Sequence, residues 1–312
     1  SSDLRKLSAL KVDAMVGHWE FTYGEKALRD NLAKSLGLDI RALKQEILEK
    51  IQWRPNVIPF LAALKAAGKQ VVLYARRPEV REKLGAEGAT IVDSVAEAAA
   101  RADVLILCLF SDVQLAEIAE GPDGFMANMK PGGVVVSHTT GNVSTLQRLV
   151  DQYPDGPAIV DGPISGSAKD IANGVLTVLL GGPETAVKPA EAVVAAYSKE
   201  VIRTGELGTA LNLKLVNNIL FAANAQLAAA AVELGAKLGI EQEDLLNALQ
   251  HCSGRSYALG AVKGTGGPER FTKAAGPFLR KDVKAAALAA ADSGVDVGWL
   301  KDVVDGGPLD LS

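Results

Sequence analysis

The middle of the chain alternates between short apolar runs and amphipathic stretches, and this alternation constrains the fold more than any other feature. The run VLILCLF at 104–110 is apolar throughout, as in strands that a parallel sheet buries on both faces. Helical patterns precede it at 95–102 and follow it at 113–120. Alternating strands and helices predict a doubly wound, Rossmann-like parallel sheet with right-handed crossovers. The expected strands lie at 70–75, 89–93, 104–110, 134–140, 158–166 and 176–182.

Helical patterns dominate both ends of the chain. ALRDNLAKSLG and DIRALKQEILEKI repeat apolar residues every three or four positions, which is typical of amphipathic helices. After about residue 200 the pattern is again nearly all helical. We therefore predict a helical N-terminal segment at 1–54, a dinucleotide-binding-like domain at 55–200 and an all-helical domain at 201–312.

Composition and charge exclude several classes of function. The chain is 48% apolar and 22% charged with a net charge of −4, so nothing favours nucleic acid or an anionic membrane as a partner. No apolar run reads as a membrane span and no signal-peptide pattern is present, so we expect a cytoplasmic protein. The two cysteines fit a reducing compartment, and Cys108, within an apolar strand, is expected to be buried. No histidine or acid cluster has metal-ligand spacing.

A lysine and an asparagine share one face of a long apolar helix. Gly205 and Gly208 form a turn before the helix, which contains Lys214 and, four residues later, Asn218. Burial would lower the pKa of this lysine toward a range useful for proton transfer. From these residues alone, a lysine whose stem lies along apolar surface at a helix edge explains the pattern equally well.

Three motifs in order resemble the β-hydroxyacid dehydrogenases, the family of 3-hydroxyisobutyrate and 6-phosphogluconate dehydrogenases. They are DGPISGS at 161–167, the glycine turn and helix from Gly205 to Asn218, and the Lys281-Asp282 pair. The resemblance runs from about residue 69 onward. Two positions depart from the family pattern, with Ser167 and Ala210 each standing where the family has glycine.

The resemblance implies an oxidoreductase that transfers hydride between a nicotinamide and a small hydroxyacid. It makes Lys214 the general acid and base for the substrate hydroxyl and gives Asn218 the task of orienting the substrate. Ser165 and the backbone amides of Gly166 and Ser167 would hold the substrate carboxylate, because a turn of small residues lets N–H groups approach an anion. Without the neighbouring motifs, this serine-glycine-serine stretch would be an ordinary turn.

The cofactor expected from the resemblance is NADP, with NAD the weaker candidate. Arg76 and Arg77 follow the strand at which this fold reads the adenosine ribose, and two arginines suit a 2′-phosphate. Taken alone, they could be a solvated charge pair at a helix start. Thr140 matches the family's ribose-contacting threonine, and Lys281 is also expected to contact the cofactor. His138 is expected to be structural.

The glycine-rich first loop of the family is absent. Its positions fall on residues 52–57, which read QWRPNV and contain no glycine. That loop lets the backbone contact the cofactor pyrophosphate, and Pro55 in addition lacks an N–H donor. We therefore expect impaired cofactor binding. The family's first strand is also missing, and Leu10 to Val16 is the best candidate to replace it.

The N-terminal segment resembles another family. Residues 1 to about 72 resemble a haloacid-dehalogenase-like nucleotidase, and the passage at 32–73 is similar to that family's cap-to-core passage. The DxDGT nucleophile motif is absent, so phosphatase chemistry cannot be carried over. We predict a chimera joined near 56–72. Two functions stay open: an NADP-dependent hydroxyacid dehydrogenase, impaired by the lost loop, or a non-catalytic or engineered chimeric fold without cofactor. The dehydrogenase family also implies a homodimer formed through the helical domain.

Overall fold

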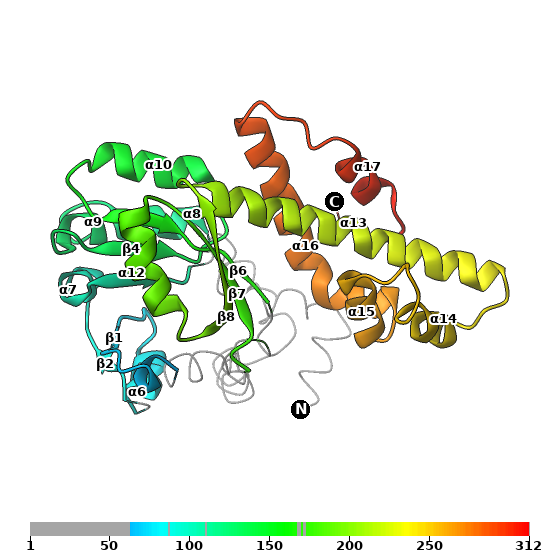
Figure 1. Ribbon diagram of the computed structural model, residues 1–312, viewed down its shortest axis with the longest axis horizontal. Coiled ribbons are helices and arrows are strands. Elements are labelled where there is room, and N and C mark those ends of the chain that lie inside the picture. The colour runs from blue at the N-terminus through cyan, green and yellow to red at the C-terminus, as the bar shows by residue number, and fades with distance from the viewer. Residues whose placement is uncertain (1–62, 87, 110, 167–169, 171–172, 312) are drawn as a thin grey trace, which may run out of the picture. The chain divides into compact units, whose positions relative to one another are not determined.

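The computed structural model divides the chain into two units, Ser1–Pro55 and Asn56–Ser312, and its described part lies in the second (Figure 1). The residues that the structure describes are 63–86, 88–109, 111–166, 170 and 173–311.

Several predictions fall outside the described residues. They concern the helical segment at 1–54 with its candidate strand, the loop at 52–57 and Ser167. The nucleotidase resemblance and the chimera therefore stay predictions.

A six-stranded sheet forms the centre of the first described domain, in the order β3-β4-β5-β7-β6 with β8 beside β7. β3, β4 and β5 run parallel, and β7 runs antiparallel to β5 and β6 but parallel to β8. The Rossmann-like fold with its parallel strands is thus confirmed, and β6 and β7 add antiparallel pairings to it. The predicted strand 158–166 turns at Gly162 and Pro163, and its second half pairs with β7. The bounds are β3 Val104–Leu107, β4 Val134–Ser137, β5 Ala158–Asp161, β6 Ile164–Ser165, β7 Leu176–Gly181 and β8 Ser198–Gly205.

A separate parallel pair consists of β1 (Val72–Leu73) and β2 (Thr90–Ile91). Among the described strands, none connects this pair to β3. In a doubly wound sheet, the family's first strand would lie between these two groups. The described part of the sheet is therefore interrupted at the position where the sequence predicts a missing strand.

Helices cover both faces of the sheet, and the pleat decides which residues face which helices. Val135 packs with α7, α8, α9 and α10, whereas its neighbours Val134 and Val136 pack with α12. Successive strand residues point to opposite faces, which accounts for this division. The bounds are α6 Pro78–Ala86, α7 Val95–Arg101, α8 Asp112–Ala119, α9 Phe125–Asn128, α10 Val143–Gln152 and α12 Glu184–Val194.

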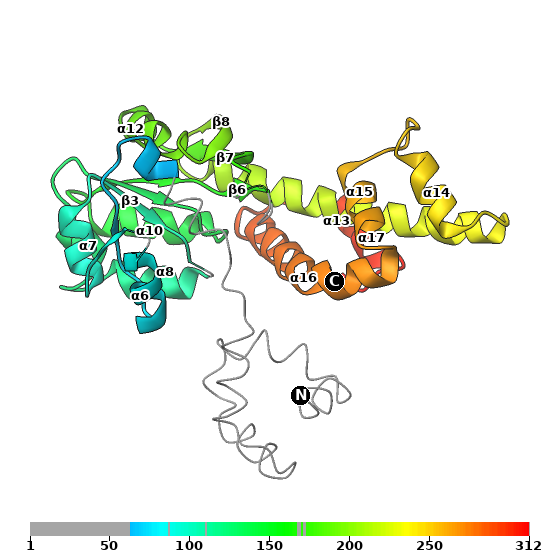
Figure 2. The ribbon, with the colours of Figure 1, turned by 90° about the horizontal axis from the view of Figure 1, so that it is seen from below.

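The second described domain is all helical and is built around α13 (Thr209–Lys237), as Figure 2 shows. One face of α13 packs on α15, α16 and α17, and the buried residues of these helices form one apolar cluster. The helical part begins with α13, because β8 continues past the predicted boundary at residue 200 to Gly205. The bounds are α14 Gln242–Leu249, α15 Tyr257–Gly264, α16 Pro268–Asp292 and α17 Trp299–Gly306.

By length and composition alone, α13 could also cross a membrane. Core helices pass the same test, and the buried face of α13 forms the centre of the helical domain. Its composition is therefore explained by its packing.

The prediction of a buried Cys108 is wrong, since its side chain is exposed. Strand β3 ends at Leu107, whose pairing with Ser137 is the last in the register. Cys108 follows that pairing, so the apolar run in the sequence extends further than the strand.

Candidate active site

The carboxylate of Asp161 holds the start of helix α13. This residue ends β5 and is fully buried, and its Oδ1 accepts the N–H of Gly208 at 2.8 Å. Its Oδ2 accepts the N–H of Leu211 at 2.7 Å. Burial raises the pKa of Asp161, while these hydrogen bonds lower it. The first turn of a helix has unpaired N–H groups and a positive dipole end, so a carboxylate is well suited to this position.

Gly208 is required at this junction for two reasons. Its φ of 92° lies in the left-handed region, which favours glycine. A Cβ at this position would lie 2.3 Å from the Cγ1 of Val143 on α10. The close approach lets α13 begin directly against the sheet domain.

Lys214 lies one turn further along α13, in a partly buried position. Burial lowers the pKa of its amine, and the attraction of Asp282 on α16 partly offsets this by raising it. The amine is therefore partly shielded from bulk water and is attracted by a carboxylate of another helix. Such an amine can exchange a proton with a bound hydroxyl.

Asn218 offers an unused hydrogen-bond donor on the same face of α13. Its side chain is 6% exposed, and its Oδ1 accepts the Nδ2 of Asn217 at 3.2 Å. The Asn218 Nδ2 is buried and has no hydrogen-bond partner among the residues that the structure describes. A buried donor left unpaired costs about 1–3 kcal/mol, so a ligand that supplies an acceptor here would gain that amount. This orphaned donor beside Lys214 fits a polar substrate.

Two acidic residues, Asp112 and Asp282, interact with the lysines of the site. The sequence patterns predicted no role for either. Burial raises the pKa of Asp282, and Lys281 and Lys214 both lower it. Asp112 on α8 also has a pKa raised by burial and lowered by the N–H of Asn142 and by Lys281. Lys281 thus interacts with carboxylates from both domains. Asp112 follows strand β3 at the helix start, and that position could have identified it.

The predicted carboxylate-binding turn follows β5 closely. Ser165 ends β6 and is half-buried, with Thr177 of β7 as its pairing partner. Gly166 has a φ of 140°, and a Cβ there would lie 2.7 Å from Leu176 Cδ2, so glycine is required. Within the described part of the chain, no hydrogen bond joins Ser165 to Lys214 or Asn218.

Three of the four predicted cofactor residues lie after the carboxyl ends of parallel strands, whereas Lys281 lies on α16. Thr140 follows β4 and is half-buried, while exposed Arg76 and half-buried Arg77 lie between β1 and α6. Beside Thr140, the Ser137 Oγ and Thr139 Oγ1 are buried, and neither has a hydrogen-bond partner in the described part of the chain. Open α/β sheets bind ligands at this edge, and hydroxyl and guanidinium groups suit ribose and phosphate. The described residues therefore fit a nicotinamide dinucleotide.

His138 has a structural position, as expected. Its Nδ1 donates to the carbonyl of Gly162, and its Nε2 accepts the hydroxyl of Tyr197 at 2.8 Å. Burial lowers its pKa. Both ring nitrogens are thus engaged within the sheet domain, linking the ends of β4 and β5 to the segment after α12.

Comparisons with known proteins agree with this arrangement. Residues 58–205 match the NAD binding domain of 6-phosphogluconate dehydrogenase, and residues 208–305 match the NAD-binding domain of NADP-dependent 3-hydroxyisobutyrate dehydrogenase. The two matches meet at the glycine turn between β8 and α13. The first match begins after the stretch that lacks the expected glycines.

Individual relatives are hydroxyacid dehydrogenases. L-threonate dehydrogenase of Cupriavidus necator is 32% identical over 200 residues, covering 62% of this chain and 66% of its own. Mouse mitochondrial 3-hydroxyisobutyrate dehydrogenase is 28% identical over 201 residues, covering 64% of this chain and 60% of its own. The chain thus spans roughly three fifths to two thirds of the length of these relatives.

A solved structure shows the same fold. Mycobacterium tuberculosis 3-hydroxyisobutyrate dehydrogenase with L-serine superimposes with a TM-score of 0.69 at 24% identity. The alignment covers 80% of this chain and 87% of the solved one. Fold, motif order and both domain matches lead to one conclusion: over residues 58–305, this chain belongs to the β-hydroxyacid dehydrogenase family.

Proposed function

We propose that the chain is an NADP-dependent dehydrogenase of small hydroxyacids. The observation that carries the proposal is the partly buried amine of Lys214, which shares a helix face with the unpartnered amide of Asn218. Relatives named for L-threonate and 3-hydroxyisobutyrate support a substrate with a carboxylate and a nearby hydroxyl.

In this proposal the residues of α13 handle the reacting oxygen. Lys214 takes the proton from the substrate hydroxyl during oxidation and returns it during reduction. Asn218 Nδ2 donates to a substrate oxygen and so gains the partner that it lacks. Ser165 and the backbone around Gly166 and Ser167 bind the carboxylate. When bound, the nicotinamide supplies the hydride acceptor.

Four side chains would hold the cofactor. Arg76 and Arg77 would contact the 2′-phosphate, Thr140 the ribose, and Lys281 the part of the cofactor facing α16. We propose weakened affinity relative to family members with the glycine loop, because residues 52–57 lack the glycines that let the backbone approach the pyrophosphate. The domain matches favour this reading over a fold that binds no cofactor.

The experiment is a calorimetric titration with NADPH and NADH, followed by turnover assays with L-threonate and 3-hydroxyisobutyrate. We expect saturable NADPH binding, and a Lys214→Ala variant that binds NADPH unchanged but has no turnover. Lys273→Ala is the matched control, because Lys273 on α16 is exposed and pairs with Glu269. Absence of binding for both nucleotides, or full turnover by Lys214→Ala, would contradict the proposal.

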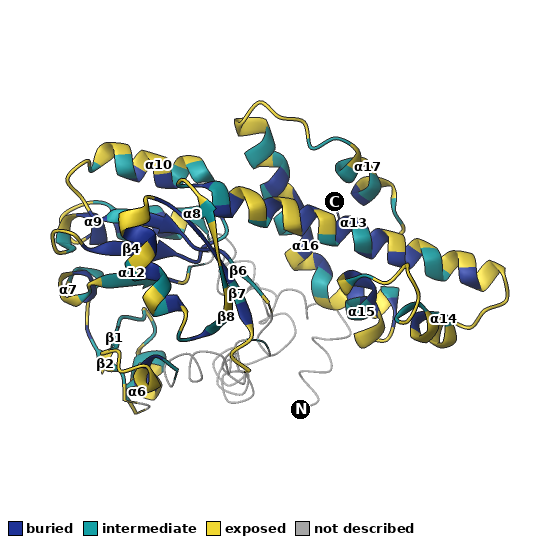
Figure 3. Ribbon diagram, in the orientation of Figure 1, coloured by how far each residue is buried: buried dark blue, intermediate teal, exposed yellow. Residues whose placement is uncertain are grey.

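We further propose that a second copy of the chain packs on α13. The helix has a second apolar face opposite its buried one, and Figure 3 shows exposed bands along its length. Seven-residue steps separate Leu213, Leu220, Leu227 and Leu234, so these four exposed leucines lie on one stripe. A repeat of this kind can pair with its own copy in a second chain. The exposed apolar residues of the stripe are Leu213, Val216, Leu220, Leu227, Leu234 and Leu238.

A further inference from the structure

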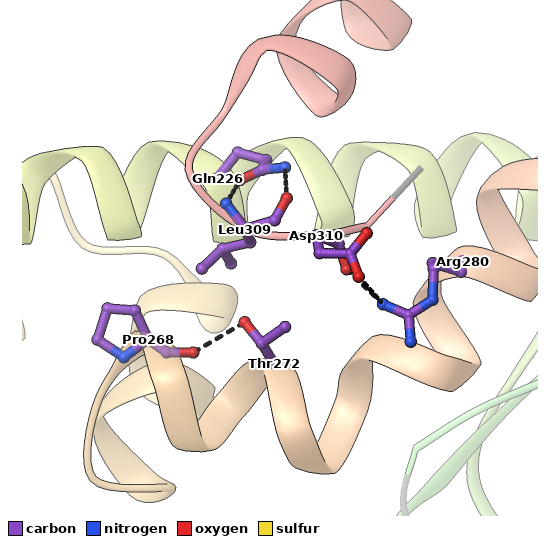
Figure 4. Close-up of polar contacts among 6 residues, drawn as sticks. All are labelled: Gln226, Pro268, Thr272, Arg280, Leu309 and Asp310. Carbon is purple, nitrogen blue, oxygen red and sulfur yellow. Dashed lines mark hydrogen bonds and ion pairs between the residues drawn. The ribbon is translucent and has the colours of Figure 1, made fainter. Parts of the chain in front are cut away.

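A short segment after α17, residues 307–311, returns across α13 and α16 (Figure 4). We call it the strap. Gln226 in the middle of α13 is 1% exposed, and its Nε2 donates to the carbonyl of Leu309 at 2.8 Å. Its Oε1 accepts the N–H of the same residue at 2.7 Å. One side-chain amide therefore pairs with the backbone of Leu309 in both directions.

The strap is fixed closely against α13. The same Gln226 Nε2 donates to the carbonyl of Val304 at 2.6 Å, near the end of α17 where helix carbonyls lack internal partners. A Cβ at Gly307 would lie 2.4 Å from the Gln226 side chain, so only glycine permits this approach. Leu309 and Leu311 are buried in the apolar cluster of the helical domain.

The other side of the strap contacts α16 directly before the site. Arg280 Nη1 donates to the backbone carbonyl of Asp310 at 2.6 Å and to its Oδ2 at 3.1 Å. Arg280 immediately precedes Lys281 and Asp282. The strap thus connects the middle of α13 to the part of α16 that faces Lys214.

That part of α16 follows a weak point in the helix. Pro277 lies inside α16 and has no N–H, so the hydrogen bond to the carbonyl four residues earlier is lost. Arg280 lies one turn after Pro277. The missing bond lies in the turn before Pro277, so the part of α16 from Arg280 onward is joined to the preceding part less firmly than in an uninterrupted helix. The strap supplies contacts just after that point.

We propose that the strap positions Asp282 beside Lys214, with Gln226 and Arg280 as its positioning residues. The proposed function is needed only for the claim that this arrangement serves catalysis by Lys214. The attraction between Asp282 and Lys214 is a feature of the folded chain and can be measured without turnover.

The test is the pKa of the Lys214 amine, measured by competitive acetylation across pH with mass spectrometry of the Lys214 peptide. Gln226→Leu removes all three hydrogen bonds of this side chain, two to the strap and one to α17, without changing any charge. If the strap positions Asp282, that attraction weakens and the pKa of Lys214 falls by about half a pH unit or more. Asp282→Asn should lower it at least as much.

The matched control is Gln250→Leu, the same substitution at a side chain that bonds only within its own helix end, to Leu246. We expect no shift in the pKa of Lys214 there. An unchanged pKa in folded Gln226→Leu, or in Asp282→Asn, overturns the proposal.

Arg280→Gln serves if Gln226→Leu does not fold, because Arg280 is partly exposed and outside the core. Losing a nearby positive charge would by itself raise the pKa of Lys214, whereas release of Asp282 would lower it. A fall supports the strap, and a rise or no change overturns it. If wild-type protein shows no turnover but these shifts occur, the proposed function fails and the strap stands.

Discussion

The carboxylate of Asp161 accepts the backbone N–H of Leu211 at 2.7 Å, and this hydrogen bond joins the sheet domain to the helix that carries the candidate acid and base. Ser165 lies four residues after Asp161, and Lys214 three residues after Leu211. The proposed carboxylate-binding turn and the proposed proton-transfer group are therefore each only a few residues away from the Asp161–Leu211 hydrogen bond.

Replacing Asp161 by asparagine should destabilise the protein by about 2–3 kcal/mol, because one of the two backbone donors loses its charged acceptor in a buried position. Urea unfolding followed by circular dichroism measures the change. Asp151→Asn is the control, since Asp151 accepts only an exposed side-chain bond from Gln147 and should change stability by less than about 0.5 kcal/mol. If Asp161→Asn and Asp151→Asn change the free energy of unfolding equally, Asp161 does not have this structural role.

His138 should make stability depend on pH. Burial lowers its pKa below the ordinary 6.5, so between these values the unfolded chain binds a proton that the folded chain does not. The free energy of unfolding should therefore fall as pH drops below about 6.5, by up to about 1.4 kcal/mol per pH unit. Unfolding curves at pH 7.5 and 5.5 measure this, and His138→Gln should flatten the difference. If the free energy of unfolding of His138→Gln depends on pH as strongly as that of the wild type, another group causes the pH dependence.

The leucine stripe on α13 should determine the oligomeric state. Leu220→Lys and Leu227→Lys together place two charges in the proposed seam, and we expect dimers to become monomers in analytical ultracentrifugation. Ile202→Lys is the control, because Ile202 is similarly exposed at 47% but lies on β8. Monomeric wild-type protein, or dimers in the double variant, would exclude this interface.

Local patterns predicted some parts of the site, whereas contacts between distant segments supplied others. The shared helix face of Lys214 and Asn218 follows from a four-residue spacing, and the glycine turn before them marks the helix start. The attraction between Asp282 and Lys214 depends on how α16 packs on α13, and no spacing in the sequence encodes it. The roles of Asp161 and Gln226 were missed for the same reason.

In the sheet, sequence patterns likewise predicted where strands lie, whereas tertiary contacts determine their direction and their ends. Apolar runs located the strands, but they carry no information about direction, so the antiparallel pairing of Ser165 with Thr177 was not predicted. Cys108 looked like a strand residue because hydrophobicity alone does not show where pairing ends. Strand β8 extends past residue 200 to Gly205 and contains no fully buried residue, so no apolar run in the sequence marks where it ends.

Cofactor preference should depend on Arg76 and Arg77. Replacing both by alanine removes charge-assisted hydrogen bonds to a 2′-phosphate, each worth about 1.5–3 kcal/mol, so NADPH affinity should fall by at least about tenfold. NADH has no 2′-phosphate, and its affinity should stay within about twofold, so the ratio of the two dissociation constants isolates this contact. Arg148→Ala is the control, because Arg148 lies on α10 and forms a surface ion pair with Glu120, the residue that follows α8. If the affinities for NADPH and NADH fall equally, the arginines act through general charge or folding. If neither affinity falls, the 2′-phosphate binds elsewhere.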